Sequence, residues 1–249
     1  VTNIDSVGLI TARNGIEIGA RPGVAASISV DGNMIVSGIT TLGSDAIINS
    51  INVGKGANSV AGNTVVGETA LDASVTGGNN TAIGKDTLSD LTSGARNTAI
   101  GADAGENITT GNDNTAIGSG TMVDLTTGSN NTSCGKGSLA LITTASNNTA
   151  VGYDAMNANT TGTQNVAVGT QALDANTTAN SNVAIGYVAL GANTTGADNT
   201  AVGTAALDAN TTASANTAVG RSALGANTTG ANNVAVGYGA LDANTTAAE

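Results

Sequence analysis

The chain repeats itself with a period of 17 residues, without insertion or deletion. Asn recurs at this spacing from Asn63 to Asn233, and Gly follows four residues after each Asn, from Gly67 to Gly237. Eleven such repeats fill residues 63–249. Counting from the Asn as position 1, position 2 is Thr or Val, position 3 is mostly Ala, position 4 is Val or Ile except for Cys134, position 5 is Gly, and positions 8 and 9 are usually Ala-Leu. The fold of this region must therefore be built from near-identical stacked units.

A unit of this length excludes most repeat architectures. Helical hairpin repeats need about 33 residues or more. A heptad coiled coil does not fit the period, and Gly with β-branched residues opposes helix. Collagen needs Gly at every third residue and abundant Pro, whereas this chain has Pro 1. We predict an all-β solenoid of eleven coils, with one strand at positions 1–5 and a second at positions 7–9 and 11–14. Stacking at ~4.8 Å gives a rod of roughly 50 Å.

The core of this solenoid must be built from small aliphatic side chains. Hydrophobic residues make up 40% of the chain, yet Trp and Phe are absent and Tyr numbers 3. We expect position 4 to point inward and to face the Leu of position 9, and each such burial contributes about 1.5–3 kcal/mol. Examples are Ile83 and Val202 at position 4, and Leu173 and Leu207 at position 9.

Position 3 alternates with position 4 along the strand and is therefore expected to point away from the core. Because it is Ala in nine repeats, we interpret it as a surface that packs closely against a second chain. The alternative is that Ala fills a tight corner.

The invariant Asn and Gly are interpreted as structural. Stacked Asn side chains can bond to one another and to turn backbone, and Gly ends each strand in a turn. Representative members are Asn80, Asn97, Asn114, Asn199, Gly84, Gly101, Gly118 and Gly203. Position 12 is also Asn in the last six repeats but is apolar in repeats two to five. We expect the early coils to bury this position, and the late coils to expose it or satisfy it with a second Asn ladder.

Two further positions show a pattern along the rod. Position 10 alternates between Asp and Gly in the last five repeats, from Asp174 to Asp242, which keeps like charges two coils apart. Position 6 holds all three tyrosines, Tyr153, Tyr187 and Tyr238, and is expected to be exposed. This line of tyrosines could stack on sugars, or it is a tolerant surface position.

Residue types for several chemistries are missing. His numbers 0, which excludes His-based triads and imidazole metal sites. Cys134 occupies position 4 and is expected inside, as an apolar substitute. We expect no enzyme activity, no cofactor and no metal. The net charge of −11 disfavours nucleic acid and anionic membranes, and no apolar run of about 18 residues predicts a membrane span.

Residues 1–62 do not carry the period. Segments such as GLITARNGIEIG and ASISVDGNMIVSGITTLG alternate apolar and polar residues as strands do, and Asp31-Gly32 is a hairpin signal. We expect residues 1–45 to form a β-rich connecting or trimerisation segment. Residues 46–62 are expected to form an irregular coil that caps the edge of the solenoid over residues 63–249.

The repeat resembles the NTAVGYQAL-type arrays of bacteriophage and marine-virus tail fibres. It is also similar to the head repeats of YadA-type trimeric adhesins, which read approximately N-S-V-A-I-G. The closest stretches are NVAIGYVALGANTTG from residue 182 and NVAVGYGALDANTT from residue 233. The resemblance covers residues 63–249 and implies a homotrimer of left-handed β-rolls that attaches to a surface. The 17-residue period is longer than the adhesin repeat, so the adhesin geometry need not transfer in detail.

The sequence leads to three hypotheses of function. The first is a structural and adhesive viral fibre segment on the virion surface, which contacts other fibre or virion proteins at its ends and host glycans along its side. The second is the head of a bacterial surface adhesin, which a membrane-anchoring coiled coil and barrel in the full-length gene would identify. The third, remote, is an ice-binding solenoid with Thr lines at positions 13 and 14, although adjacent Thr residues point to opposite faces.

Overall fold

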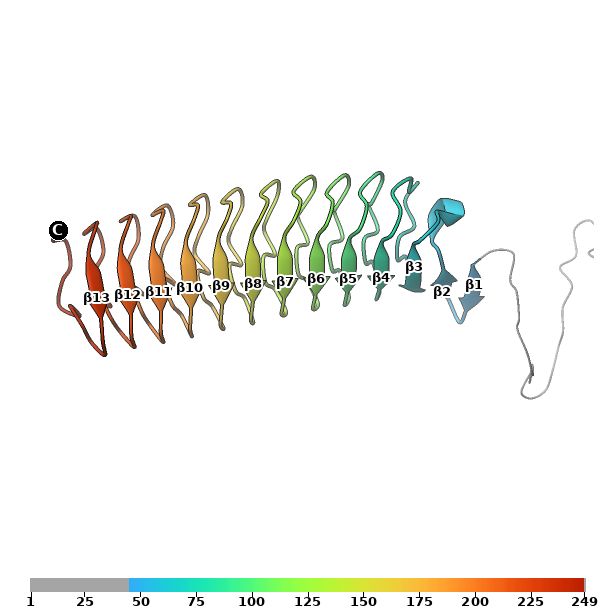
Figure 1. Ribbon diagram of the computed structural model, residues 1–249. Helices are drawn as coiled ribbons and strands as arrows, with labels where there is room; N and C mark the ends of the chain where they lie inside the picture. Colours follow the sequence, from blue (N-terminus) through green and yellow to red (C-terminus); the bar gives the residue numbers. More distant parts are fainter. Residues whose placement is uncertain (1–44, 249) are drawn as a thin grey trace, which may run out of the picture. The chain divides into compact units, whose positions relative to one another are not determined.

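The computed structural model describes residues 45–248, so the expectations for residues 1–44 fall outside the described residues. The described residues form a β-solenoid around one 13-stranded sheet, whose strands follow each other in sequence order (Figure 1). Two strands precede the repeats, β1 (Ala46–Ile48) and β2 (Ile51–Gly54). The eleven repeat strands are β3 (Thr64–Gly67), β4 (Thr81–Ile83), β5 (Thr98–Ile100), β6 (Thr115–Ile117), β7 (Thr132–Cys134), β8 (Thr149–Val151), β9 (Val166–Val168), β10 (Val183–Ile185), β11 (Thr200–Val202), β12 (Thr217–Val219) and β13 (Val234–Val236).

The repeat strands pair in parallel with each residue opposite its counterpart in the next repeat. Thr81 lies opposite Thr98, and Ala82 lies opposite Ala99. The same offset holds from β3 to β13. This register follows from the absence of insertions, and it confirms the predicted solenoid. Every side-chain type therefore forms a ladder along the stack.

The prediction of a second strand in each coil was wrong. Positions 7 to 14 form turns, although they still bond from coil to coil, as in the 3.0 Å bond from Leu173 N to Ala189 O. The reason is the backbone: positions 7 and 9 have positive φ angles, 54° at Gln171 and 55° at Leu173. A left-handed residue interrupts an extended strand.

The orientation predicted for positions 3 and 4 was also wrong. The Ala residues of position 3 point into the coil, as at Ala167 and Ala184, which are fully buried. Position 4 faces outward. Leu173 and Leu207 are buried as expected. Position 3 holds Ala in nine repeats and shares the core with the Leu of position 9, and in the first coil Val65 is buried at position 3 beside the buried Leu71. Ala at position 3 is thus the core residue, and its proposed contact with a second chain no longer stands.

Ser133, the polar exception at position 3, shows the same inward orientation. It is buried, and its Oγ donates to the carbonyl of Ser138 at 3.0 Å. Its Oγ also lies 2.5 Å from the Oγ1 of Thr121. Thr121 and Ser138 both occupy position 8, so positions 3 and 8 face each other across the coil. A hydroxyl in this core is tolerated because the opposite wall supplies partners.

The position 1 asparagines form a continuous buried ladder. Asn165 is typical: its backbone N and its Nδ2 both donate to Oδ1 of Asn148, at 3.0 and 3.2 Å. Its Nδ2 also donates to the carbonyl of Ala179 at 2.8 Å. The same arrangement holds for Asn80, Asn97, Asn114 and Asn199. Each Asn thus ties two coils together and satisfies a turn carbonyl.

Position 12 is buried from Leu91 in the second repeat to Asn227 in the tenth. The early coils fill it with Leu91, Ile108, Leu125 and Ile142, and the late coils fill it with Asn. Those Asn side chains form a second ladder, in which Asn176 Nδ2 donates to Asn159 Oδ1 at 2.8 Å. Of the two alternatives for the late coils, the buried Asn ladder is therefore the one observed.

A threonine ladder runs beside position 12. At position 13, each hydroxyl donates to the carbonyl of position 13 in the next coil, as from Thr160 Oγ1 to Thr177 O at 2.9 Å. The same bond recurs from Thr92 to Thr228. These hydroxyls hold the stack together and are not free donors for an ice surface.

The first described residues cover the starting edge of the stack. Strands β1 and β2 form an antiparallel hairpin, and β2 pairs antiparallel with β3, so that Val53 lies opposite Val66. A short 3-10 turn, η1 (Ala57–Ser59), follows. The hairpin reverses the strand direction and thereby ends the parallel ladder on this side.

Candidate functional site: the outer face of the sheet

The position 4 side chains form a line of exposed apolar groups along the sheet, which we call the outer stripe. Ile83, Ile117 and Val151 are 37%, 38% and 37% exposed. Because the strands are in register, successive members lie about 4.8 Å apart. The full stripe is Val66, Ile83, Ile100, Ile117, Cys134, Val151, Val168, Ile185, Val202, Val219 and Val236.

The outer stripe corrects the interpretation of Ile83 and Val202 as core residues. The side chains of position 2, mostly Thr, share the outward face, because positions 2 and 4 alternate with the buried Ala of position 3. The Val and Ile side chains of position 4 thus line the outside of the sheet, and the Ala side chains of position 3 line its inside. An exposed contiguous apolar surface is a candidate interaction site.

Cys134 lies within the outer stripe, and its predicted position in the core was wrong. It is exposed and makes no disulfide. The cause is the same reversal of the strand faces. A single thiol therefore marks the middle of the stripe, between Ile117 and Val151.

The three tyrosines of position 6 are exposed as predicted, but they are unevenly spaced along the stack. Tyr153 and Tyr187 are 50% and 55% exposed and lie two coils apart. Tyr238 is three coils further along, and the guanidinium of Arg221 lies 5.7 Å from its ring centre. That cation–π contact covers one face of the ring. Tyr153 and Tyr187 are therefore the two tyrosines that lie closest together along the stack, and the Arg221 contact is made by Tyr238 instead.

The alternating carboxylates of position 10 are partly withdrawn from water. Burial raises the pKa of Asp174 above its ordinary value, against hydrogen bonds from backbone amides that lower it. Burial is likewise the cause that raises the pKa of Asp208. The arrangement is consistent with the interpretation that spacing by two coils limits repulsion between these carboxylates.

We expect Asp174→Asn to stabilise the fold at neutral pH. A raised pKa means that the folded state holds the proton more tightly than the unfolded chain, so the ionised form lowers stability at pH 7. The penalty shrinks as the pH falls below the raised pKa of Asp174 in the folded state. It is gone once the pH is below the ordinary pKa of Asp, because the carboxyl group is then protonated in both states. The variant should therefore exceed the wild type in urea unfolding at pH 7 and converge with it near pH 3. The same change at exposed Asp198 is the control.

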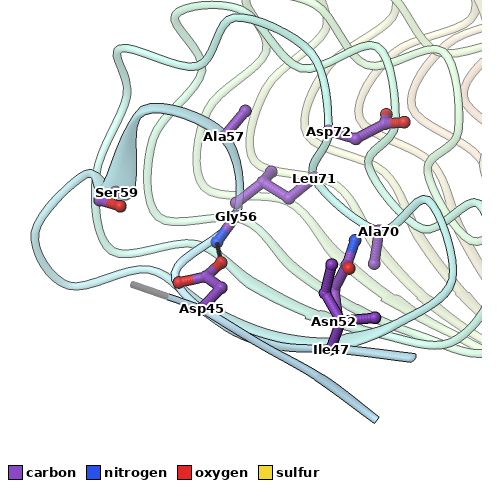
Figure 2. Close-up of a pocket in the computed structure, with 9 residues that line it drawn as sticks. All are labelled: Asp45, Ile47, Asn52, Gly56, Ala57, Ser59, Ala70, Leu71 and Asp72. Carbon is purple, nitrogen blue, oxygen red and sulfur yellow. Dashed lines mark hydrogen bonds between the residues drawn. The ribbon is translucent and has the colours of Figure 1, made fainter. Parts of the chain in front are cut away.

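A cavity of about 350 Å³ lies where the hairpin meets the first coil (Figure 2). Its lining includes Asp45, Asn52, Leu71 and Asp72. The carboxylate of Asp45 accepts hydrogen bonds from the backbone N of Lys55 at 2.8 Å and of Gly56 at 2.6 Å. Asp45 thus holds the turn that leads into the first coil, and its role here is structural.

Residues 45–248 contain no group of three His, Cys, Asp or Glu side chains that could hold a metal ion. In the same range, the helical structure amounts to a single 3-10 turn, and no helix is long and apolar enough to cross a membrane. No protein-family model, no curated protein and no solved structure matches this chain.

Proposed function

We infer that this chain is a structural and adhesive fibre segment in which copies of the rod pack side by side through the outer stripe. The observation that carries this proposal is the stripe itself, an apolar ladder present in every coil from β3 to β13. Aliphatic side chains held in register on a flat face lose little conformational freedom when they are covered, so their burial favours association.

The repeat spacing supports a second copy of the chain as the partner. A surface that offers one aliphatic group per coil is matched at every step by a surface with the same ~4.8 Å spacing. Another rod of the same sequence, aligned parallel and in register, has that spacing. An unrelated globular partner would match it over a few coils. Self-association therefore buries more of the stripe.

The resemblance to phage tail-fibre arrays and trimeric adhesins supports three copies around one axis. In such an assembly the stripes meet at the axis. The proposal places the rod on a virion surface, with Tyr153 and Tyr187 available to stack on host glycans. The head of a bacterial surface adhesin remains the alternative, which the rest of the gene would identify.

Charges placed in the outer stripe should separate the copies. The wild type is expected to have a native mass near three times 23.8 kDa by light scattering on a sizing column. The triple variant Ile83→Lys, Ile117→Lys, Val151→Lys should fall to the monomer mass, because buried unpaired ammonium groups oppose association. The matched control is Thr110→Lys, Thr144→Lys, Thr178→Lys on the exposed position 14, which should keep the wild-type mass. A monomeric wild type, or a variant with unchanged mass, contradicts the proposal.

Cys134 offers a second test, because it is the single cysteine of the chain. In a parallel, in-register assembly the Cys134 thiols of neighbouring copies meet, so mild oxidation should produce a disulfide-linked pair on a denaturing gel. Three thiols can form one disulfide, which leaves one chain in three unlinked. The double variant Cys134→Val, Thr144→Cys moves the single cysteine to position 14 and should give no such band. Equal crosslinking by the relocated cysteine would contradict the assigned interface.

A further inference from the structure

The outer stripe cannot by itself fix how far one copy of the rod is shifted along another. Its members are nearly alike, since Ile83, Ile117 and Val219 are 37%, 38% and 37% exposed. A second rod that is shifted by one coil therefore still meets a member of the stripe at every coil but one. Contacts that repeat in this way specify their register weakly. A single register between copies needs a part of the interface that does not repeat.

The hairpin of β1 and β2 carries the outer face of the sheet without sharing the repeat. β2 pairs antiparallel with β3, and Val53 lies opposite Val66 of the outer stripe, so both side chains face outward. Ala46 lies opposite Val53, and Ile48 lies opposite Ile51. Because side chains alternate along a strand, these hairpin residues share the outward face. The apolar surface thus continues from the repeats onto the hairpin.

Two isoleucines distinguish the hairpin from the repeat coils on this face. Ile48 is 58% exposed and Ile51 is 44% exposed. Asn52 is level with position 5 of the first repeat, so Ile51 reaches the level of position 6. The first two repeats hold charged residues at that position, Glu68 and Lys85. The hairpin therefore offers an apolar group where the neighbouring coils offer a charge.

A tight turn holds these two isoleucines in place. Asn49 and Ser50 connect β1 to β2, and their φ angles are 49° and 66°. Two successive residues with positive φ are typical of a type I′ turn, whose twist matches that of the paired strands. Ile48 and Ile51 flank this turn and lie directly opposite each other. The pair is therefore preorganised, and covering it costs little conformational freedom.

We propose that the outward face of the hairpin, formed by Ile48, Ile51 and Val53, sets the register between copies of the rod. This rests on self-association through the outer stripe, and the partner is the same hairpin of another copy. In register, the hairpins lie side by side and their apolar residues cover one another. A shift by one coil separates the hairpins, while the stripe loses little. The stripe thus drives association and the hairpin aligns it, as a single distinctive residue does in a coiled coil.

A disulfide between different coils reports the register, because it joins Cα atoms at most about 6.8 Å apart. One population of the full chain keeps Cys134. A second, with a tag that changes its mass, carries Cys134→Val and Val168→Cys, which moves the thiol from β7 to β9. The two are co-expressed and mildly oxidised. In register, the two kinds of thiol lie about 9.6 Å apart along the rod, so no mixed disulfide should form.

Ile48→Ser with Ile51→Ser, introduced into both populations, should release the register. We expect the native mass to stay near three times 23.8 kDa. The mixed disulfide should rise at least about fivefold, because the stripe alone permits shifted assemblies. The matched control, Ile47→Ser with Asn52→Ser, changes the opposite face of the same two strands and should give no increase. If circular dichroism shows that the first variant misfolds, Ile48→Thr with Ile51→Thr keeps the β-branched side chains and replaces it.

The outcomes separate this proposal from the one on which it rests. A monomeric wild type overturns both. The register role alone is overturned if the parent chains form the mixed disulfide as readily as the disulfides between like chains, or if the hairpin variant still forms none. It is also overturned if the folded hairpin variant falls to the monomer mass, because the hairpin would then drive association and not align it.

Discussion

Gly169→Ala is expected to lower the free energy of unfolding by at least about 3 kcal/mol. Gly169 has φ 134°, a conformation that is costly for any residue with a Cβ. A Cβ at this site would also lie 2.5 Å from the carbonyl oxygen of Gly186 and 2.7 Å from its carbon. Both are backbone atoms of the next coil, so the clash can be relieved only by separating two coils. Chemical denaturation of the purified variant measures the effect.

Gly191→Ala is the matched control for this prediction. Gly191 lies one coil further along at position 10, and a Cβ there would meet Val188 O at 3.2 Å and Asp174 Oδ1 at 3.6 Å. The free energy of unfolding of Gly191→Ala should differ from that of the wild type by less than about 1 kcal/mol, because Ala also lowers the conformational entropy of the unfolded chain and this offsets part of the cost. If both variants lost the same stability, close stacking at position 5 would not be the reason for its invariant glycine.

The period predicted the stacked register, the Asn ladder of position 1 and the buried Leu of position 9, and it left the second Asn ladder as one of two alternatives. These features depend on the spacing between repeats, which is fixed at 17 residues and leaves a single register in which Asn80 meets Asn97. Stacking is a property of whole repeats, so it needs no knowledge of which way each side chain points. For this reason the architecture could be read from the sequence.

The direction of each side chain could not be derived in this way. The larger residue of the strand, at position 4, was predicted to lie inside, because the gain from burial scales with apolar area. In the structure the smaller residue, Ala167, is the buried one and Val168 faces outward, although the first coil buries Val65 at the position of Ala167. One signal was available: Ser133 at position 3 accompanies Thr121 and Ser138 at position 8, and buried hydroxyls need partners. That combination indicates that positions 3 and 8 face each other.

The turns of positions 7 and 9 could not be predicted from residue preference. Positive φ angles favour Gly and Asn, yet position 9 is occupied mainly by Leu, and Val188 at position 7 has φ 49°. Tertiary packing imposes these conformations, because burial of Leu190 and the hydrogen bond from Leu190 N to Ala206 O outweigh the local strain. A single repeat read alone gives no sign of this balance.

Because the strand faces are reversed, the expected interface shifts from the Ala of position 3 to the Val and Ile of position 4. With Ala outside, a partner would have met a smooth surface of methyl groups. With Ile and Val outside, every coil offers a larger apolar group, and association buries more area per coil. The same reversal places Cys134 where neighbouring copies would meet. Self-association through the observed face would therefore bury more apolar area than self-association through the face that was predicted.

Asn165→Ala is expected to cost about 3 kcal/mol of unfolding free energy or more. Asn165 is fully buried, and its Nδ2 is the donor to Ala179 O at 2.8 Å. Its Oδ1 accepts from the backbone N of Asn182 at 2.9 Å and from Asn182 Nδ2 at 3.3 Å. Alanine leaves the buried backbone N–H of Asn182 without a partner, and it removes one of the two donors to Ala179 O, which keeps the bond from Asn176 Nδ2 at 3.2 Å. The unpaired N–H costs about 1–3 kcal/mol, and each further hydrogen bond lost costs about 0.5–1.5 kcal/mol.

An exposed asparagine of the same stack separates this effect from the loss of an amide in general. Asn180 is exposed, and its Oδ1 accepts from Thr163 N at 2.7 Å. Because water can replace that bond, Asn180→Ala should cost less than about 1 kcal/mol. Urea unfolding of both variants under one set of conditions gives the comparison. Equal losses would show that position 1 is not the element that holds neighbouring coils together, and the invariance of its Asn would then need another cause.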